Sequence, residues 1–285
     1  MISKVFEYWT QSSFPTDLLP LLLPRSYNQI EMTKPDKITS EKPVVVVVMP
    51  AYYAEKTIEK TFREISADLV TNIILVDDSS KDKSVEVAKK LGITVYQHPH
   101  NLGYGGNQKT CYWEALKLNP DVVVMLHPDY QYDGSKIKGL VEPILNGDYD
   151  MMFGSRIKSR GAALTGGMPK SKYFFNRLFT LGANILLGEN LSEYMSGLRA
   201  YSRKTLQTVP FQRFSNDFVF DQQFTVSAIA AGLQIGEIPI LTRYHDQASS
   251  IKWLKGLKFG VESCWQVLLY LLHKTNVYNS KIFVS

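Results

Sequence analysis

The sequence contains few cysteines and no long hydrophobic run. Only Cys111 and Cys264 occur among its 285 residues, too few for a disulfide framework or a cysteine-ligated zinc site. Both lie among apolar neighbours, so we expect reduced thiols and a cytoplasmic protein. No stretch approaches the roughly 20 apolar residues that cross a bilayer. The first residues, including Lys4 and Glu7, lack the apolar core of a signal peptide.

The excess of positive over negative charge is also small. The formal net charge of +5 is too small to predict a nucleic-acid partner. The length suits one large domain with appendages. Residues 1–42 combine several prolines and a leucine cluster without a sustained period, so we expect an N-terminal extension there. We assign the main domain to residues 43–250 and a C-terminal segment to residues 251–285. The sequence sets no oligomeric state.

Short apolar runs alternate with helical patterns from Pro43 onward. The runs are typical of strands buried on both faces of a parallel sheet, and they cover residues 44–48, 73–76, 93–96 and 122–126. We therefore predict an α/β fold with a mostly parallel, Rossmann-like sheet flanked by helices. Sheets of this kind bind ligands at the carboxyl ends of their strands. The polar residues that follow each run are thus the candidates for function.

A candidate metal site follows the run at 122–126. His127, Asp129 and Gln131 alternate in sequence, so they point to one side if the chain leaves the strand in extended form. An imidazole, a carboxylate and an amide oxygen can hold Mg²⁺ or Mn²⁺, with substrate oxygens completing the shell. A polar turn with a capping aspartate explains the same residues without a metal.

Two further candidates suit a nucleoside diphosphate. Asp77 follows the run at 73–76 and can accept a hydrogen bond from a base N–H, although an aspartate there also often caps the next helix. Gly105 and Gly106 belong to a glycine cluster at the start of a helix, where backbone N–H groups can approach phosphate oxygens.

Ordered motifs in the sequence resemble those of family-two glycosyltransferases with the GT-A fold. The resemblance runs from about Pro43 to Lys258 and is strongest for the branch around dolichol-phosphate mannose synthase and polyprenyl-phosphate glycosyltransferases. The motifs are VVVVMPAYYAEKTI at 45–58, LVDDSSKDKS at 75–84, NLGYGG at 101–106, HPDYQYD at 127–133, FGSR at 153–156 and SGLRAYSR at 196–203.

The resemblance implies an inverting enzyme that moves a hexose from a UDP- or GDP-sugar. It assigns Asp129 and Gln131 to the Mg²⁺ or Mn²⁺ ion on the diphosphate. The nucleoside would be bound by Pro50, Ala51, Tyr52, Glu55 and Asp77. The sequence departs from the family pattern at two places: Tyr53 stands where asparagine is common, and His127 replaces the first aspartate of the usual Asp-x-Asp.

The second half of the main domain is expected to bind the acceptor. By the resemblance, Arg156 would bind the phosphate of a lipid acceptor together with Lys172 and Asn176. Lys172 and Asn176 are spaced to share one helix face. Lysine stands where the family has arginine, which keeps the charge but loses the bidentate fork. A solvated basic loop is the alternative interpretation. The same helix is apolar on more than one side, which suits core packing first and a lipid groove second.

The acceptor class separates the functional hypotheses. We predict transfer to a polyprenyl phosphate, catalysed through Asp129 and Arg156. The alternative is a hydroxyl acceptor, a polysaccharide or small sugar, with Asp221 as general base, because relatives with hydroxyl acceptors carry a carboxylate near this place. A third interpretation is that the Asp221 carboxylate only faces solvent and has no role in the reaction. Since His127 breaks the metal motif, a non-catalytic nucleotide-sugar-binding subunit is a further alternative.

The pattern at residues 251–273 predicts an amphipathic helix. One arc carries Lys252, Lys255, Lys258, Glu262, Gln266 and His273, with Trp253 and Trp265 mostly opposite. A basic stripe beside tryptophans and leucines is typical of a helix that lies in a membrane interface. We therefore expect peripheral binding at the cytoplasmic face of a membrane. Packing of the same helix on the domain is the alternative.

Overall fold

The computed structural model describes residues 42–158, 162–243 and 253–283. All of them belong to one compact unit, Lys34–Ser285. The extension expected over residues 1–42 lies, except for its last residue, outside the described part of the chain.

The centre of this unit is a seven-stranded sheet in the order β3-β2-β1-β4-β6-β5-β7. Its strands are β1 (Val45–Ala51), β2 (Asn72–Asp77), β3 (Thr94–Gln97), β4 (Val122–Met125), β5 (Met151–Ser155), β6 (Arg199–Ser202) and β7 (Ile235–Pro239). Within this described sheet only β6 runs antiparallel, to both β4 and β5. Two reversals restore the direction, so β5 runs parallel to β4 and β1. The carboxyl ends of β1, β2, β4 and β5 therefore meet at one edge, and the predicted mostly parallel α/β sheet is confirmed.

The valine-rich strands are central because helices cover both faces of the sheet. Every residue of β1 and β4 is buried, as expected for strands without a solvated face. The helices are α3 (Ile58–Arg63), α4 (Ser84–Lys90), α5 (Tyr104–Leu116), α6 (Ile137–Leu145), α7 (Ala162–Thr165), α8 (Lys170–Leu187), α9 (Arg203–Thr208), α10 (Phe220–Ala230) and α11 (Trp253–Lys274), with 3₁₀ turns η2 (Gly134–Lys136) and η3 (Phe211–Arg213).

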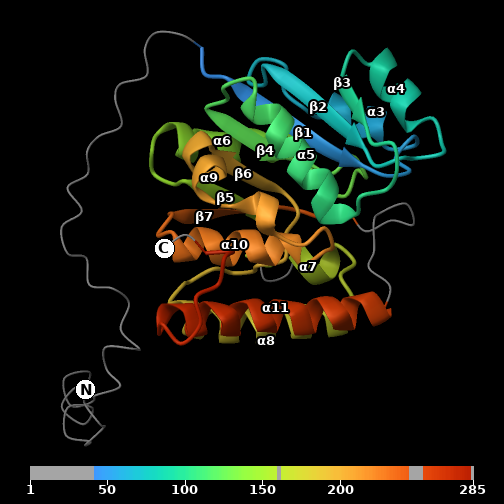
Figure 1. Ribbon diagram of the computed structural model, residues 1–285. Helices are drawn as coiled ribbons and strands as arrows, with labels where there is room; N and C mark the ends of the chain where they lie inside the picture. The colour runs from blue at the N-terminus through green and yellow to red at the C-terminus, as the bar shows by residue number, and fades with distance from the viewer. Residues whose placement is uncertain (1–41, 159–161, 244–252, 284–285) are drawn as a thin grey trace, which may run out of the picture. The chain divides into compact units, whose positions relative to one another are not determined.

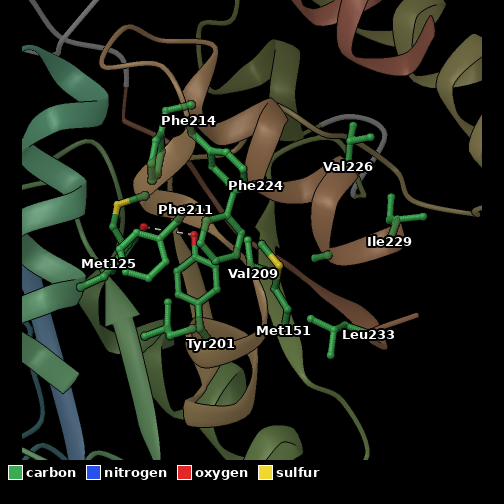
Figure 2. Packing of buried hydrophobic residues seen from close by; sticks show 14 of the residues in the cluster. Met125, Met151, Tyr201, Val209, Phe211, Phe214, Phe224, Val226, Ile229 and Leu233 are labelled. Carbon is green, nitrogen blue, oxygen red and sulfur yellow. Dashed lines mark hydrogen bonds between the residues drawn. The ribbon is translucent and has the colours of Figure 1, made fainter. Parts of the chain in front are cut away.

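Two apolar cores lie on opposite faces of the sheet. One packs the even-numbered valines of β1 against α5, α9 and α10, and the other packs the odd-numbered ones against α3, α4 and α6. The first core is rich in aromatic rings around Phe224, which packs on Tyr201 at a ring-centroid distance of 4.7 Å (Figure 2). This core continues beyond α10 to α11, whose side chains Val267 and Tyr270 are buried in it.

Helices α8 and α11 form an outer layer on the far side of α10 from the sheet (Figure 1). Helix α8 is the predicted helix that carries Lys172, and the expectation that its large apolar side chains pack in the core is wrong for most of them. The side chains that α8 buries are Asn176, Thr180, Ala183 and Leu187. Its large apolar side chains are at least 46% exposed: Phe174, Phe175, Leu178, Leu181, Ile185 and Leu186.

The second outer helix, α11, also turns apolar side chains outward. Leu257, Val261, Trp265 and Leu268 are exposed, whereas Gln266 on the predicted polar arc is buried. Lys258 is exposed and pairs with Asp217 at 2.7 Å. Lys252 and the side chains of residues 253–255 lie outside the described part. Within that part no helix is long and apolar enough to cross a membrane.

Candidate active site

Asp77 ends β2 at the edge where the parallel strands finish. The side chain is fully buried, and its Oδ2 accepts hydrogen bonds from the Ser80 N–H at 2.9 Å and, weakly, from Gln97 Nε2 at 3.4 Å. Its Oδ1 is buried and has no hydrogen-bond partner among the described residues. A buried acceptor without a partner is uncommon, so this oxygen is suited to a donor from a ligand, such as a base N–H. The loop contact and the ligand role are compatible.

Asp78, which the sequence analysis did not single out, fixes the neighbouring loop. Its carboxylate accepts from the N–H groups of Leu102 and Gly103 at 2.8 and 3.0 Å and lies 2.8 Å from His98 Nδ1. The contacts hold the glycine cluster against β2. The doubled aspartate of the LVDDSS motif was the signal for it.

The predicted nucleoside-binding residues of β1 lie beside Asp77. Pro50 and Ala51 are buried, and Ala51 pairs with Asp77 across the sheet. Tyr52 is 55% exposed and meets the ring of Tyr53 edge-on at 4.6 Å. Tyr53 adopts a φ of 53°, a left-handed conformation that asparagine tolerates better than tyrosine. An aromatic pair thus follows directly after the end of β1, the strand that pairs with β2.

Glu55 already has a partner within the protein. Its Oε2 accepts a hydrogen bond from the Lys83 N–H at 2.7 Å, just where α4 begins. This contact stabilises the helix start, and a nucleoside contact by Glu55 stays a prediction.

The glycines at the start of α5 serve close packing. The N–H of Gly105 donates to the Asn216 carbonyl at 2.8 Å, so the expectation that this amide faces a phosphate is wrong. A Cβ at Gly105 would collide with the Ser215 carbonyl oxygen, and one at Gly106 would lie 2.8 Å from Leu102 Cβ. Phosphate binding by Gly106 stays a prediction.

The loop after β4 does not continue in extended form. Pro128 and Asp129 form a turn, and Tyr130 has a φ of 59°. The expected alternation of His127, Asp129 and Gln131 on one side is therefore wrong, because a turn and a left-handed residue interrupt the strand period. Asp129 is 8% exposed, and its Oδ1 accepts from the Gln131 N–H at 3.1 Å.

The oxygen donors of this loop nevertheless suit a hard cation. Among the described residues no cluster of at least three His, Cys, Asp or Glu side chains is placed to hold a metal. Mg²⁺ bound to a nucleotide commonly uses one or two carboxylates, with phosphates and water supplying the other ligands. Asp129, with the Gln131 amide, fits that donor set.

Asp221 lies in α10, facing the first turns of α5. Its Oδ2 accepts from the Tyr104 hydroxyl at 2.7 Å and its Oδ1 from Gln108 Nε2 at 3.1 Å. His127 Nε2 is 3.2 Å from the same hydroxyl. Burial, and then the charge of Asp221, raise the pKa of Tyr104 well above its ordinary value. Tyr104 belongs to the NLGYGG motif but was not singled out, and Gln108 belongs to none of the motifs.

The predicted acceptor residues come together at the carboxyl end of β5. Arg156 is buried, pairs with Glu193 at 2.6 Å and donates to the Met195 carbonyl at 2.9 Å. Asn176 Nδ2 donates to Glu193 at 3.3 Å. Burial lowers the pKa of Lys172, as does the charge of Arg156, while Glu193 raises it. Glu193, the shared partner of this cluster, was not predicted.

Comparison with known proteins places the chain in a family. The profile of Glycosyl transferase family 2 matches residues 46–209. The chain is 28% identical to a UDP-N-acetylglucosamine–dolichyl-phosphate N-acetylglucosaminyltransferase of Methanococcus voltae over 70% of this chain and 86% of that protein. It is also 28% identical to a dolichyl-phosphate hexose transferase of Haloferax volcanii, over 73% and 86% of the two chains.

The fold is also found among solved structures. Glucosyl-3-phosphoglycerate synthase of Mycobacterium tuberculosis, in complex with Mn²⁺, UDP and glucosyl-3-phosphoglycerate, aligns with a TM-score of 0.59 at 21% identity, over 84% of this chain and 82% of that one. The family profile spans more than half of the sequence, from the first strand to the end of α9. The chain therefore belongs to glycosyl transferase family 2 and is a glycosyltransferase.

Proposed function

We propose that the chain transfers a hexose from a nucleoside diphosphate sugar to a polyprenyl phosphate at a membrane surface. The observation that carries this proposal is the meeting of Arg156, Lys172 and Asn176 at the start of α8, a helix with an exposed apolar face. A phosphate on an apolar tail matches both features. The two dolichyl-phosphate transferases among the relatives support the same acceptor class.

The donor would bind across the ends of β1, β2 and β4. Asp77 would accept from the base through its unpaired Oδ1, with Tyr52 beside it. Asp129 and Gln131 would hold Mg²⁺ or Mn²⁺, and His127 is the further candidate ligand. When bound, such an ion offsets the charge that develops on the departing diphosphate. The buried position of Asp129 strengthens that electrostatic effect because little water screens it.

The acceptor phosphate needs positioning more than deprotonation. It is an anion at neutral pH, so Arg156 and Lys172 would aim one of its oxygens at the sugar carbon. The hydroxyl-acceptor alternative requires Asp221 to take a proton. Both oxygens of Asp221 already accept hydrogen bonds, from Tyr104 and Gln108. This arrangement favours the lipid phosphate.

Membrane binding would place the acceptor cluster at the headgroup level. The exposed side chains of α8 and α11 form the apolar part of the binding surface, and exposed patches of this kind mark interaction sites. Lys170, Lys172 and Arg177 lie on α8 beside the apolar face and suit anionic lipid. We assign the protein to the cytoplasmic face, where nucleotide sugars are made.

A labelling experiment tests the proposal. The protein is incubated with Mn²⁺, a panel of radiolabelled UDP- and GDP-sugars and membrane lipid extract. We expect label in an organic-soluble product that mild acid releases. Label found only in water-soluble material would support the hydroxyl-acceptor alternative and overturn the lipid acceptor.

A further inference from the structure

Tyr104 links the loop after β4 with α10. Its hydroxyl lies 2.7 Å from Asp221 Oδ2 and 3.2 Å from His127 Nε2. Its ring stacks on the imidazole at a centroid distance of 5.5 Å, and Phe218 packs on it at 4.8 Å. A carboxylate, a phenol and an imidazole thus form one chain of hydrogen bonds.

The positions of the hydrogens in this chain follow from which of the three groups can donate one. A carboxylate has no hydrogen to give, so Tyr104 uses its single hydrogen to bond Asp221. The two oxygens lie 2.7 Å apart, a distance that requires this hydrogen between them. The Tyr104 oxygen then accepts from His127. In the neutral imidazole the hydrogen therefore sits on Nε2, and Nδ1 keeps its lone pair.

Asp221 is held too firmly to act as a mobile acceptor. Tyr104 and Gln108, one helical turn apart on α5, each bind one of its carboxylate oxygens. Its backbone carbonyl accepts from Arg199 Nη1 at 3.0 Å and from the Thr225 hydroxyl at 2.9 Å. Arg199 is fully buried. The carboxylate is therefore anchored through both its side chain and its backbone.

We infer that Tyr104 and Asp221 are positioning residues that hold His127 as its Nε2–H tautomer, with Nδ1 directed to the donor complex. The inference rests on the proposed function, because the metal and diphosphate of the donor are what Nδ1 would serve. Imidazoles that bind metals commonly donate their other N–H to a fixed partner, which sets tautomer and orientation. Tyr104 and Asp221 would thus orient the histidine that replaces the family's aspartate.

Nitrogen NMR of the full chain tests the tautomer directly. The protein is labelled with ¹⁵N-histidine, and the signals of His127 are assigned among the five histidines by their loss in His127→Gln. Two-bond proton–nitrogen couplings distinguish the tautomers. We expect neutral His127 to carry its hydrogen on Nε2. A wild-type Nδ1–H tautomer would overturn the inference without the need for any Tyr104 variant.

A matched pair of variants tests the role of the hydroxyl. Tyr104→Phe removes the link to His127. Tyr112→Phe removes a buried hydroxyl from the same face of α5, where it donates to Gln108 Oε1 at 2.7 Å. We expect Tyr104→Phe to lose the fixed tautomer and to weaken Mn²⁺ binding in the presence of UDP about tenfold, measured by electron paramagnetic resonance. Tyr112→Phe is expected to keep both, and equal effects of the two variants would contradict the inference.

Asp221→Asn separates positioning from base catalysis. Asparagine has one side-chain oxygen for the two donors Tyr104 and Gln108. We therefore expect the fixed tautomer to be lost and Mn²⁺ binding to weaken, as in Tyr104→Phe. Loss of transfer with unchanged Mn²⁺ affinity would assign a proton-accepting role to Asp221 instead. Failure of the wild-type protein to label lipid would count against the proposed function alone, since the tautomer and Mn²⁺ measurements do not depend on the acceptor.

Discussion

Helices at the two ends of the molecule present different surfaces. We call the end with the proposed nucleotide-sugar site the donor side and the end with the proposed lipid-phosphate site the acceptor side. On the donor side, α3 and α4 expose charged residues paired along the helix, Arg63 with Glu59 and Lys90 with Glu86. On the acceptor side, α8 and α11 expose large apolar side chains, among them Leu181 at 61%. The first pattern is that of helices in water. The second is the pattern expected of helices that meet a less polar environment, and it is the reason why membrane binding is proposed for α8 and α11.

The polar groups differ between the two sides as well. Most donor-side carboxylates, such as Asp78 and Glu55, are occupied by hydrogen bonds within the protein, which leaves the Oδ1 of Asp77 for a ligand. The acceptor cluster sets Arg156 and Lys172 against the single carboxylate of Glu193. If the acceptor phosphate binds here as proposed, it would share Arg156 with Glu193. Variants on the two sides are expected to fail in different assays.

The largest expected effect is on the donor side. Asp129→Ala removes the carboxylate assigned to the metal, so we expect the transfer rate to fall on the order of 10³-fold. Initial rates at saturating Mn²⁺ measure this. Asp133→Ala is the control, because its carboxylate binds Ser135 in the same loop. A rate above a tenth of wild type in Asp129→Ala would remove Asp129 from the metal site.

Membrane binding provides the next prediction. Replacing Leu178 and Leu181 together by glutamate should lower partitioning onto anionic vesicles by at least about a hundredfold, since each buried leucine contributes about 1.5–3 kcal/mol. Sedimentation with phosphatidylglycerol vesicles measures the effect. Leu118→Glu is the control at an exposed leucine away from α8. Unchanged sedimentation of the double variant would show that α8 does not enter the lipid.

The third prediction concerns Lys172. Lys172→Ala should raise the KM for lipid phosphate about tenfold, the size expected for one charged hydrogen bond, while UDP-sugar affinity stays unchanged. Lys138→Ala is the control, an exposed lysine on α6 outside this cluster. If donor affinity falls instead, the cluster serves the nucleotide, and the division into two sides is wrong.

The smallest expected effect is a dependence on pH. The lowered pKa of Lys172 means that its charge is present below that pKa and is lost as pH rises through it, earlier than for an ordinary lysine. The KM for lipid phosphate should therefore increase a few-fold by about pH 10. Lys172→Arg keeps its charge and should shift the increase to higher pH. Identical profiles of the two proteins would assign the pH effect elsewhere.

On the donor side, the sequence predicted the strands of the sheet better than the contacts between side chains. The valine runs at 44–48 and 122–126 correspond to β1 and β4, because buried parallel strands are continuous in sequence. Partners such as Tyr104 and Asp221, 117 residues apart, depend on how helices approach one another. Strand β7 was also missed, since its residues IGEIP lack a sustained apolar run.

Local backbone geometry set a second limit. The left-handed conformation of Tyr130 has no sequence signal in a tyrosine, so the extended path expected after β4 failed there. For the acceptor, the motif resemblance identified Arg156, Lys172 and Asn176, and the structure brings them together. Glu193, their common partner, carried no motif of its own. Periodicity gave the apolar positions of α8, but the outward direction of that face depends on what α10 and α11 leave uncovered.

The apolar face of α8 has a consequence for work with the isolated protein. In buffer without lipid, this face is expected to associate with the same face on other copies. Gel filtration should then give a mixture of species whose average size increases with protein concentration. A mild detergent should disperse the mixture into one species by covering Leu181 and its neighbours. Assays in detergent would then measure a chain whose exposed apolar helices are already covered.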